Sequence, residues 1–196
     1  MYDETNVNVY DFDDTIYNGD STADFIIYSL KKHPKIFVTF PETFKAFIKF
    51  YVLKKGSKTQ FKEVLYRLLK YCDTEKDVHE FWETHMKNIK KWYLDSKKEN
   101  DVIISASPEF LLKIPCENLG IKYLMASRVD PHTGLYDGEN CHGEEKVRRF
   151  YEKFPESIRV DKFFSDSYSD TPLAKIASKS YIVKGNKLRD WDFGKK

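Results

Sequence analysis

The sequence predicts an α/β fold in which a parallel sheet is interrupted, just after its first strand, by a helical insertion. Short apolar runs alternate with helical patterns at the start of the chain and again after residue 99, which is typical of parallel strands with crossover helices. Between them, apolar residues recur at helical spacing. Residues 31–99 contain 17 Lys and Arg against 9 Asp and Glu, whereas the remainder contains 16 against 22. We expect a Rossmann-like core from residues 1–16 and 99–196, and a helical cap from residues 17–98.

The expected strands of the core are five short apolar runs bounded by polar residues or turns. They cover residues 7–11, 102–104, 123–125, 162–164 and 181–183. Residues 109–112 and 144–153 supply crossover helices between strands. The turn-forming residues 130–134 predict the tip of a hairpin.

The insertion predicts about four helices. The first covers residues 22–32 and ends before Pro34, because a helix seldom continues into a proline. Ser57 and Gln60 have the capping-box spacing that begins the third helix. Thr74 is expected to cap a fourth helix that continues to Trp92.

The second helix of the insertion carries an aromatic stripe. Its members, spaced four, three and four residues apart, share one helical face: Phe40, Phe44, Phe47 and Tyr51. We expect this face to pack in the core of the cap. A helix that contacts a partner or a membrane surface is the alternative, because lysines accompany the stripe at positions 45, 49, 54 and 55.

Composition limits the class of protein. Of the 196 residues, 41% are hydrophobic and 16% aromatic, which favours a folded core. The net charge of +2 is not typical of a strongly basic nucleic-acid-binding protein, although the basic insertion leaves nucleic-acid binding as an alternative. Three separated cysteines fit a reducing compartment. Residues 1–8 lack a basic leader, and no apolar run approaches about 20 residues. We therefore expect a cytoplasmic protein without a membrane or nucleic-acid partner.

Carboxylates gather at the end of the first expected strand. Asp11, Asp13 and Asp14 lie within four positions, followed by Thr15. Such close acids repel one another unless a cation or a proton separates them. Because ligands of open α/β sheets bind at the carboxyl ends of strands, this cluster predicts a site for a hard cation such as Mg²⁺. An acidic surface turn is the alternative.

Three further features follow expected strands or begin expected helices. Asp166 and Asp170 follow the run at 162–164, although Asp170 also stands where it would cap the next helix. Ser105 follows the run at 102–104 and begins a helix, where a hydroxyl and free N–H groups can hold an anion. Lys146 provides one cation near the start of a crossover helix.

In this order, these features resemble the motifs of the haloacid dehalogenase-like hydrolase superfamily. The first motif is Asp-x-Asp-x-Thr, and the others are a strand-end serine, a lysine and an acid pair. The insertion after the first motif resembles the helical-cap subgroup that includes the phosphoserine phosphatases. The resemblance implies a Mg²⁺-dependent phosphatase that forms an aspartyl-phosphate. A phosphotransferase with the same intermediate and a non-catalytic regulator that binds phosphate or protein are the alternatives.

The resemblance also implies a role for each residue. Asp11 would be the nucleophile, and Asp13 the general acid and then the general base. Asp11, the carbonyl of Asp13, and Asp166 would bind Mg²⁺, with Asp170 and Thr15 in support. Ser105 and Lys146 would hold the phosphoryl oxygens.

The expected substrate is a small phosphomonoester enclosed by the cap. Asp20 and Ser21 lie in the hinge into the cap, so they either contact the substrate or cap the next helix. Residues 106–108 read Ala-Ser-Pro, where phosphoserine phosphatases usually carry glycines. This departure argues against specificity for phosphoserine.

Overall fold

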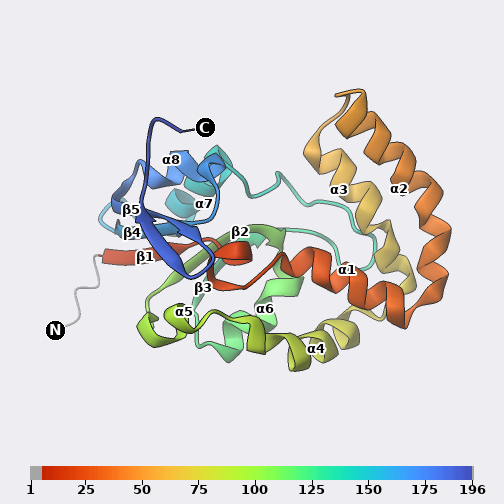
Figure 1. Cartoon of the computed structure of the whole chain (residues 1–196), viewed down its shortest axis with the longest axis horizontal. Coiled ribbons are helices and arrows are strands. Elements are labelled where there is room, and N and C mark those ends of the chain that lie inside the picture. The colour runs from red at the N-terminus through yellow and green to blue at the C-terminus, as the bar shows by residue number, and fades with distance from the viewer. Residues whose placement is uncertain (1–5, 196) are drawn as a thin grey trace.

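The computed structural model describes residues 6–195 and shows an α/β core from which a helical hairpin projects (Figure 1). Residues 1–5 and Lys196, assigned above to the ends of the core, lie outside the described residues, as does most of the segment in which no leader is expected. Within the described part, no helix has the length and apolar composition needed to cross a bilayer.

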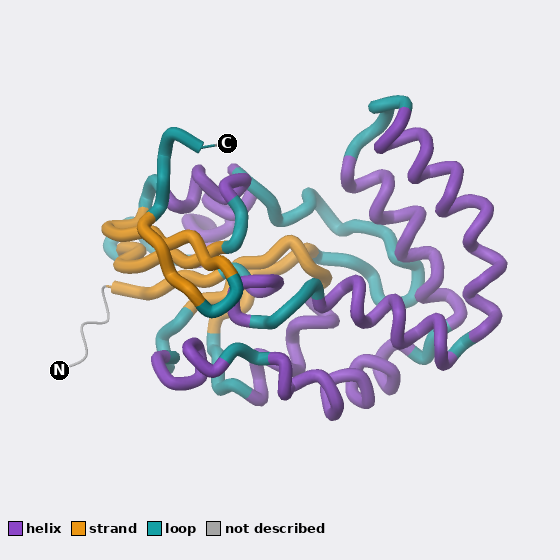
Figure 2. The backbone as a smooth tube through the Cα atoms, in the orientation of Figure 1, coloured by secondary structure: helices purple, strands orange, loops and turns teal. Residues whose placement is uncertain are grey.

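The core is one sheet, in which the described strands follow the order β3-β2-β1-β4-β5-β6 (Figure 2). Strands β1 to β5 pair in parallel, and β6 is antiparallel to β5. The strands are β1 (Asn6–Tyr10), β2 (Val102–Pro108), β3 (Tyr123–Ser127), β4 (Arg159–Ser165), β5 (Ala177–Lys184) and β6 (Lys187–Asp190). The α/β fold class and all five predicted strands are confirmed.

The edge strand β6 is not among the predicted strands. Its four residues are all exposed, so it has no apolar run to reveal it. It is joined to β5 by Gly185 and Asn186, and Gly185 has a φ of 60°. A Gly-Asn pair between two runs is a signal for a tight hairpin, and it is the local feature that predicts this strand.

Alternate side chains of the sheet enter two hydrophobic clusters. Tyr10 and Phe164 belong to one cluster, and their neighbours Val9 and Phe163 belong to the other. Helices contribute to each cluster, so both faces of the sheet are covered, as the near-continuous apolar strands require. The helices are α6 (Glu109–Asn118) in the first cluster, and α7 (Glu144–Lys153) and α8 (Thr171–Ala174) in the second.

The insertion consists of helices joined by short helical turns. The helices are α1 (Ser21–Lys32), α2 (Phe40–Phe47), α3 (Lys58–Tyr66), α4 (Thr74–His85) and α5 (Lys91–Ser96). The turns are Pro34–Thr39, Ile48–Val52, Arg67–Tyr71 and Met86–Asn88. The predicted first helix is confirmed, beginning one residue earlier than expected.

Two predicted helix starts have different outcomes. At α3 the capping box is present, because Gln60 N–H donates to Ser57 Oγ at 3.1 Å and Ser57 N–H donates to Gln60 Oε1 at 3.2 Å. At α4 the prediction is wrong, because Thr74 Oγ1 donates to the carbonyl of Pro131 at 2.7 Å. Thr74 thus ties α4 to the hairpin loop at 130–134.

The fourth helix does not continue to Trp92, so that prediction is also wrong. It ends at His85, and Ile89 has an extended backbone that pairs with Tyr17 in an antiparallel bridge. Lys90 N–H donates to the carbonyl of Ile16 at 2.7 Å. Backbone hydrogen bonds that a longer helix would use therefore go to the segment after β1.

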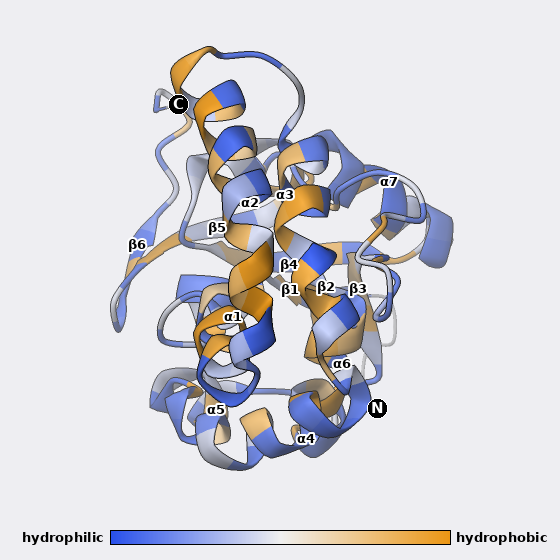
Figure 3. Ribbon diagram, turned by 90° about the vertical axis from the view of Figure 1, so that its right-hand side faces the viewer, coloured by the Kyte–Doolittle hydropathy of each residue, from blue (hydrophilic) through white to orange (hydrophobic). Residues whose placement is uncertain are grey.

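The aromatic stripe does not pack in the core of the cap, so that prediction is wrong. Phe40, Phe44, Phe47 and Tyr51 are all exposed. The first three belong to α2, which Figure 3 shows beside α3, and Tyr51 belongs to the helical turn that follows it. Packing between the two helices includes Phe50, which stacks on Phe61 of α3 with ring centroids 5.7 Å apart. Spacing identifies the residues that share a face, but not what covers it.

One part of the insertion shares the hydrophobic cluster of the core. Trp82 of α4 contacts the ring of Phe12, with centroids 5.9 Å apart, and its indole N–H donates to the carbonyl of Leu111 at 2.7 Å. The α2–α3 hairpin instead stands away from the sheet (Figure 1). The division of the chain at residues 17 and 98 stays a prediction.

Candidate active site

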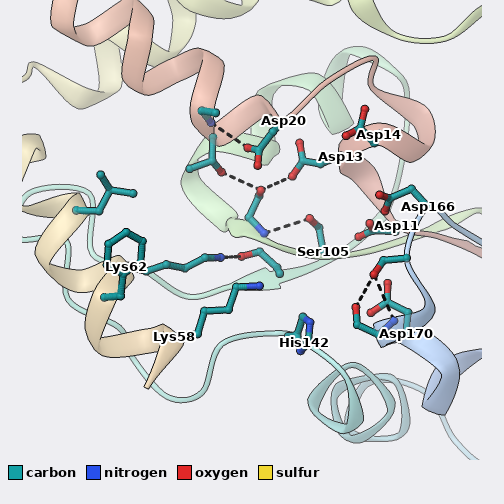
Figure 4. A pocket seen from close by; sticks show the side chains of 18 of the residues that line it. Asp11, Asp13, Asp14, Asp20, Lys58, Lys62, Ser105, His142, Asp166 and Asp170 are labelled. Carbon is teal, nitrogen blue, oxygen red and sulfur yellow. Dashed lines mark hydrogen bonds between the residues drawn. The ribbon is translucent and has the colours of Figure 1, made fainter. Parts of the chain in front are cut away.

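A cavity of about 420 Å³ lies at the carboxyl ends of the parallel strands, where ligands of open α/β sheets bind. Both the core and helices α1 and α3 line it (Figure 4). Predicted site residues that line the cavity are Asp11, Asp13, Asp20, Ser105, Lys146, Asp166 and Asp170. Thr15 and Ser21 lie behind this lining and hydrogen-bond to residues that form it.

Lys146 joins two of the acids at the centre of the site. From the buried side of α7, its Nζ donates to Asp11 Oδ1 at 2.8 Å and to Asp170 Oδ2 at 2.7 Å. Burial alone would lower the pKa of this lysine, but the two carboxylates raise it above its usual value. Lys146 is therefore a buried, charged ammonium, and two of its three N–H donors are in use.

Asp11 follows β1, and its backbone N–H donates to the carbonyl of Phe164 in the neighbouring strand at 2.9 Å. Burial raises the pKa of its carboxyl group to about 7, although the charge of Lys146 acts in the opposite direction. The negative charge of Asp170 raises it further. A cation or an approaching phosphate group therefore has a strong effect on the ionisation of Asp11.

Asp13 is held by two donors from different parts of the fold. Its Oδ1 accepts a hydrogen bond from the N–H of Ser21 at 2.7 Å, and its Oδ2 accepts one from the hydroxyl of Ser107. Burial, with a further contribution from the charge of Asp20, raises the pKa of Asp13 to about 6. This carboxyl group can thus exchange a proton near neutral pH.

Two hydroxyls organise the strand ends. Ser105 lies within β2 and does not begin a helix, since α6 starts at Glu109, so that prediction is wrong. It is buried, and its Oγ accepts a hydrogen bond from the N–H of Ser107 at 3.1 Å. Thr15 is also buried, and its Oγ1 accepts a hydrogen bond from the N–H of Asp166 at 2.9 Å. Thr15 therefore joins the loop after β1 to the loop after β4, and both loops carry acids.

Asp166 has the properties of a cation ligand. Its carboxylate lines the cavity. The hydrogen bonds of Asp166 to Thr15 and Lys184 use its backbone, so the carboxylate itself has no hydrogen bond or ion pair with any residue from 6 to 195. Burial, followed by the negative charge of Asp14, raises its pKa. Oxygen donors without a cationic partner suit Mg²⁺, which takes one or two carboxylates and completes its shell with water and phosphate oxygens. The residues present therefore fit such an ion.

Asp170 stands at the first position before α8, but its side chain does not cap that helix. Its Oδ2 instead accepts hydrogen bonds from Lys146 and from Ser165 Oγ, at 2.7 and 2.8 Å. The capping alternative is therefore wrong for this residue. Asp170 and Asp11 hold the ammonium of Lys146 between them.

At the hinge, Asp20 caps α1 and also lines the cavity. Its Oδ1 accepts a hydrogen bond from the N–H of Ala23 at 2.9 Å. Ser21 is buried, and its hydroxyl has no hydrogen-bond partner among the described residues. The helix-capping alternative is confirmed for Asp20, and contact with a substrate stays a prediction for both residues.

Helix α3 brings two lysines to the cavity that the motifs do not identify. Lys62 Nζ donates to the carbonyl of Ala106 at 3.0 Å and to Asn140 Oδ1 at 3.3 Å. Burial, and then the like charge of Lys58, lowers the pKa of Lys62 to about 8. Both lysines face the acid cluster across the cavity (Figure 4). Neither differs in local sequence from the other lysines of the insertion.

A third lysine supports the loop after β1 from behind. Lys90 is buried, and its Nζ donates to the carbonyl of Asp14 and, at 2.8 Å, to that of Gly185. Asp14 has a φ of 49°, a conformation that aspartate tolerates better than most residues. Lys90 thus stabilises the turn that follows Asp13.

One histidine and one cysteine come together away from the cavity. His33, Cys72 and Asp77 bring their donor atoms within 4.8 Å of one another, although their spacing in the sequence does not predict it. Asp77 accepts from His33 Nε2 at 2.6 Å and pairs with Lys32 Nζ at 2.8 Å. The charge of this buried acid is therefore already balanced by the chain itself.

The fold and the cavity define the class of the protein. Its sequence matches the family of haloacid dehalogenase-like hydrolases over residues 9–175, which is most of the chain, and the protein belongs to that family. Among curated relatives, protein CicA of Caulobacter vibrioides is 32% identical over 88 residues. That segment covers 42% of this chain and 40% of CicA, which is less than half of either protein.

Two solved structures show the same fold. A protein of unknown function from Bordetella pertussis Tohama I has a TM-score of 0.74 and 18% identity over 89% of this chain and 88% of that one. A phosphoserine phosphohydrolase-like protein from Francisella tularensis has a TM-score of 0.56 and 15% identity over 89% and 85%. The chain therefore has the fold of a phosphoserine phosphohydrolase-like protein, as the motifs predict.

Proposed function

We propose that the protein is a Mg²⁺-dependent phosphatase that hydrolyses a small phosphomonoester through an aspartyl-phosphate on Asp11. The observation that carries the proposal is the pairing of two unlike carboxyl groups in one cavity. Asp11 is bound to a buried lysine, whereas Asp13 is bound to neutral donors and has a pKa of about 6. Two carboxyl groups in such different surroundings suit a nucleophile and an acid.

In the first step, a carboxylate oxygen of Asp11 attacks phosphorus and the bond from phosphorus to the ester oxygen breaks. The proton of Asp13 goes to the departing alkoxide, which leaves as an alcohol. In the second step, the ionised Asp13 takes a proton from water as that water attacks the phosphorus of the acyl phosphate. Inorganic phosphate and the Asp11 carboxylate are released.

The remaining residues hold the phosphoryl group. Lys146 retains one N–H donor for a phosphoryl oxygen after its bonds to Asp11 and Asp170. Ser105 supplies a hydroxyl from the neighbouring strand end. Charge on the phosphoryl oxygens is stabilised by such pre-positioned donors.

Asp11, the carbonyl of Asp13, and Asp166 would hold Mg²⁺, with Asp170 in support. A bound Mg²⁺ supplies positive charge that offsets the repulsion between the acids and a phosphate dianion. The carboxylate of Asp166, which has no partner among the described residues, supports this assignment. Removing the metal with a chelator is expected to abolish turnover and to leave the fold intact.

The proposed substrate class is a small phosphomonoester. Lys58 and Lys62 add positive charge opposite the acids, which favours an anionic substrate. The Francisella tularensis neighbour is a phosphoserine phosphohydrolase-like protein, but this chain carries Ala106, Ser107 and Pro108 after the strand-end serine. The proposal therefore covers small phosphomonoesters and not phosphoserine in particular.

Turnover of p-nitrophenyl phosphate with and without Mg²⁺ tests the proposal, using Asp11→Asn and the exposed control Asp137→Asn. Loss of the nucleophile is expected to lower kcat by at least ~1,000-fold, and the control is expected to keep wild-type activity. Full activity of Asp11→Asn, or equal turnover in a chelator, contradicts the proposal. Phosphate that appears on an added alcohol acceptor, and not as free phosphate, identifies a phosphotransferase instead.

A further inference from the structure

The aromatic stripe of the projecting hairpin is exposed along its whole length. We define it as Phe40, Phe44, Phe47 and Tyr51, with exposed fractions of 45%, 65%, 44% and 45%. The ring of Phe47 contacts that of Tyr51, with centroids 4.9 Å apart, and the ring of Tyr51 also contacts Phe61 of α3, with centroids 5.4 Å apart. Single exposed apolar residues are common, whereas several exposed aromatic residues grouped on one helix and the turn after it indicate a binding surface.

The apolar surface continues beyond both ends of the stripe. Phe37 and Val38 precede it and Val52 and Leu53 follow it, and all four are more than half exposed. Phe37 contacts Phe40, with ring centroids 4.9 Å apart. Exposed apolar residues therefore extend along α2 and into the turns on either side of it.

Lysines surround this apolar surface. The segment 34–61 contains one acid, Glu42, and that acid pairs with Arg67. Its six lysines are at positions 35, 45, 49, 54, 55 and 58, and none of them forms an ion pair with another described residue. The projecting hairpin therefore combines an aromatic face with uncompensated positive charge.

The hairpin is placed to reach a surface that the core does not touch. Figure 1 shows α2 and α3 standing away from the sheet, and α2 lies on the outer side of α3. Tyr51, the last residue of the stripe, also lines the cavity that contains Asp11. An object bound to the stripe would thus lie beside the mouth of the candidate active site.

We propose that the α2–α3 hairpin docks on an anionic membrane surface. Aromatic rings on one face and lysines around it are the features of an amphipathic helix that lies in the lipid interface. A second copy of the chain fits less well, because two such hairpins would bring like charges together without acids to balance them. The proposal revises the expectation of no membrane partner, and it does not depend on the phosphatase activity.

Flotation with vesicles tests the proposal on the full chain, comparing phosphatidylcholine alone with a mixture that contains phosphatidylglycerol. Binding to the anionic vesicles is expected to exceed binding to the neutral ones at least tenfold and to weaken as salt is added. Two variants, F40S/F44S/F47S and K45Q/K49Q/K54Q/K55Q, are each expected to bind the anionic vesicles at least tenfold more weakly than the wild type.

Matched controls carry the same changes elsewhere on the surface. They are L94S/L135S/Y151S, three other exposed apolar residues, and K91Q/K113Q/K122Q/K179Q, four other exposed lysines. Both controls are expected to bind anionic vesicles like the wild type. Equal losses in the controls and in the hairpin variants overturn the proposal, as does failure of the wild type to float.

A conservative variant keeps the proposal testable if the triple change disturbs folding. Phe44→Trp adds a reporter to the stripe, and its emission, taken as the difference from the wild type, is expected to shift to the blue with anionic vesicles. An unchanged emission contradicts docking. Light scattering that shows a dimer dependent on the stripe, together with no vesicle binding, assigns the stripe to a second copy of the chain and overturns the proposal.

Discussion

Asp11 and Asp13 lie two positions apart, yet the structure places them in different electrostatic surroundings. Burial raises the pKa of both, to about 7 and about 6. Asp11 accepts a hydrogen bond from the charged ammonium of Lys146, whereas Asp13 accepts hydrogen bonds from the neutral donors of Ser21 and Ser107. The different partners of the two carboxyl groups thus suit Asp11 to attack phosphorus and Asp13 to donate a proton.

The proton of Asp13 gives a prediction about leaving groups. Its raised pKa keeps the acid protonated up to about pH 6, and the protonated fraction falls about tenfold per pH unit above that value. For an alkyl phosphate, kcat/KM is therefore expected to fall as pH rises above about 7, where Asp11, with a pKa of about 7, is itself ionised and only the loss of the Asp13 proton remains. Asp13→Asn is expected to lower kcat/KM for that substrate by about 10²–10⁴-fold.

An aryl phosphate separates this role from a structural one. Because p-nitrophenolate leaves without a proton, Asp13→Asn is expected to lower kcat/KM much less for p-nitrophenyl phosphate than for the alkyl phosphate. Measured pH profiles of kcat/KM for both substrates check the difference. Equal losses with both substrates would show that Asp13 does not act as the acid.

Lys62 gives a second prediction at the scale of one residue. Burial lowers its pKa to about 8, so it is charged below that pH and loses its charge above it. The KM for a phosphomonoester is expected to rise as pH increases through 8. Lys62→Met is expected to raise KM by about tenfold at pH 7, since an anion loses a charged partner, and to remove this pH dependence.

Lys70→Met is the matched control for Lys62, because Lys70 belongs to the same insertion and is exposed outside the cavity. It is expected to leave KM unchanged. Steady-state kinetics between pH 7 and 9 measure both variants. A KM that stays constant in the wild type across this range would remove Lys62 from substrate binding.

At the scale of the element, a close approach joins the hairpin loop 130–134 to helix α3. Gly134 has a φ of 74°, and a Cβ added there would lie 2.5 Å from the carbonyl oxygen of Tyr66. Gly134→Ala is therefore expected to lower the free energy of unfolding, through backbone strain and through overpacking of about 1–3 kcal/mol.

Gly138→Ala separates these two causes. Gly138 also has a positive φ, of 94°, but nothing lies within 4 Å of an added Cβ. It is expected to show the strain alone, so chemical denaturation should find Gly134→Ala the less stable variant. Equal midpoints and slopes for the two variants would mean that α3 moves aside at no cost.

Local patterns predict elements well where neighbouring residues decide the structure. The capping box at Ser57 depends on residues three positions apart, and it is present as predicted. The end of α4 at His85 depends on Tyr17, which pairs with Ile89 from a distant part of the chain. A helical pattern cannot reveal this competition, because the partner is chosen by tertiary structure.

At the scale of the whole molecule, the charges are divided between the two parts of the chain. Residues 31–99 carry an excess of basic residues, and the remainder carries an excess of acids. Lys58 and Lys62 of the basic part face the acids across the cavity. A positive field on that side would attract an anionic substrate to a site whose own acids repel it.

Ionic strength tests this attraction. Salt shortens the screening distance from roughly 10 Å at 0.1 M to roughly 3 Å at 1 M, so kcat/KM for a phosphomonoester is expected to fall severalfold while kcat stays constant. Kinetics over a series of salt concentrations, at fixed Mg²⁺, measure both quantities. If kcat/KM does not change with salt, the lysines of the insertion are only a solvated face.

The sequence by itself determined the class of the molecule and the order of its motifs. Parallel strands place their carboxyl ends at one edge of a sheet, so acids that follow separate strands come together there, however many residues separate them in the sequence. Tertiary structure decided which lysines of the insertion join those acids, since Lys58 and Lys62 line the cavity and yet do not differ in local sequence from the other lysines of that segment. It also decided that the aromatic stripe is exposed, because exposure depends on what packs against a face and not on the spacing of the residues along it.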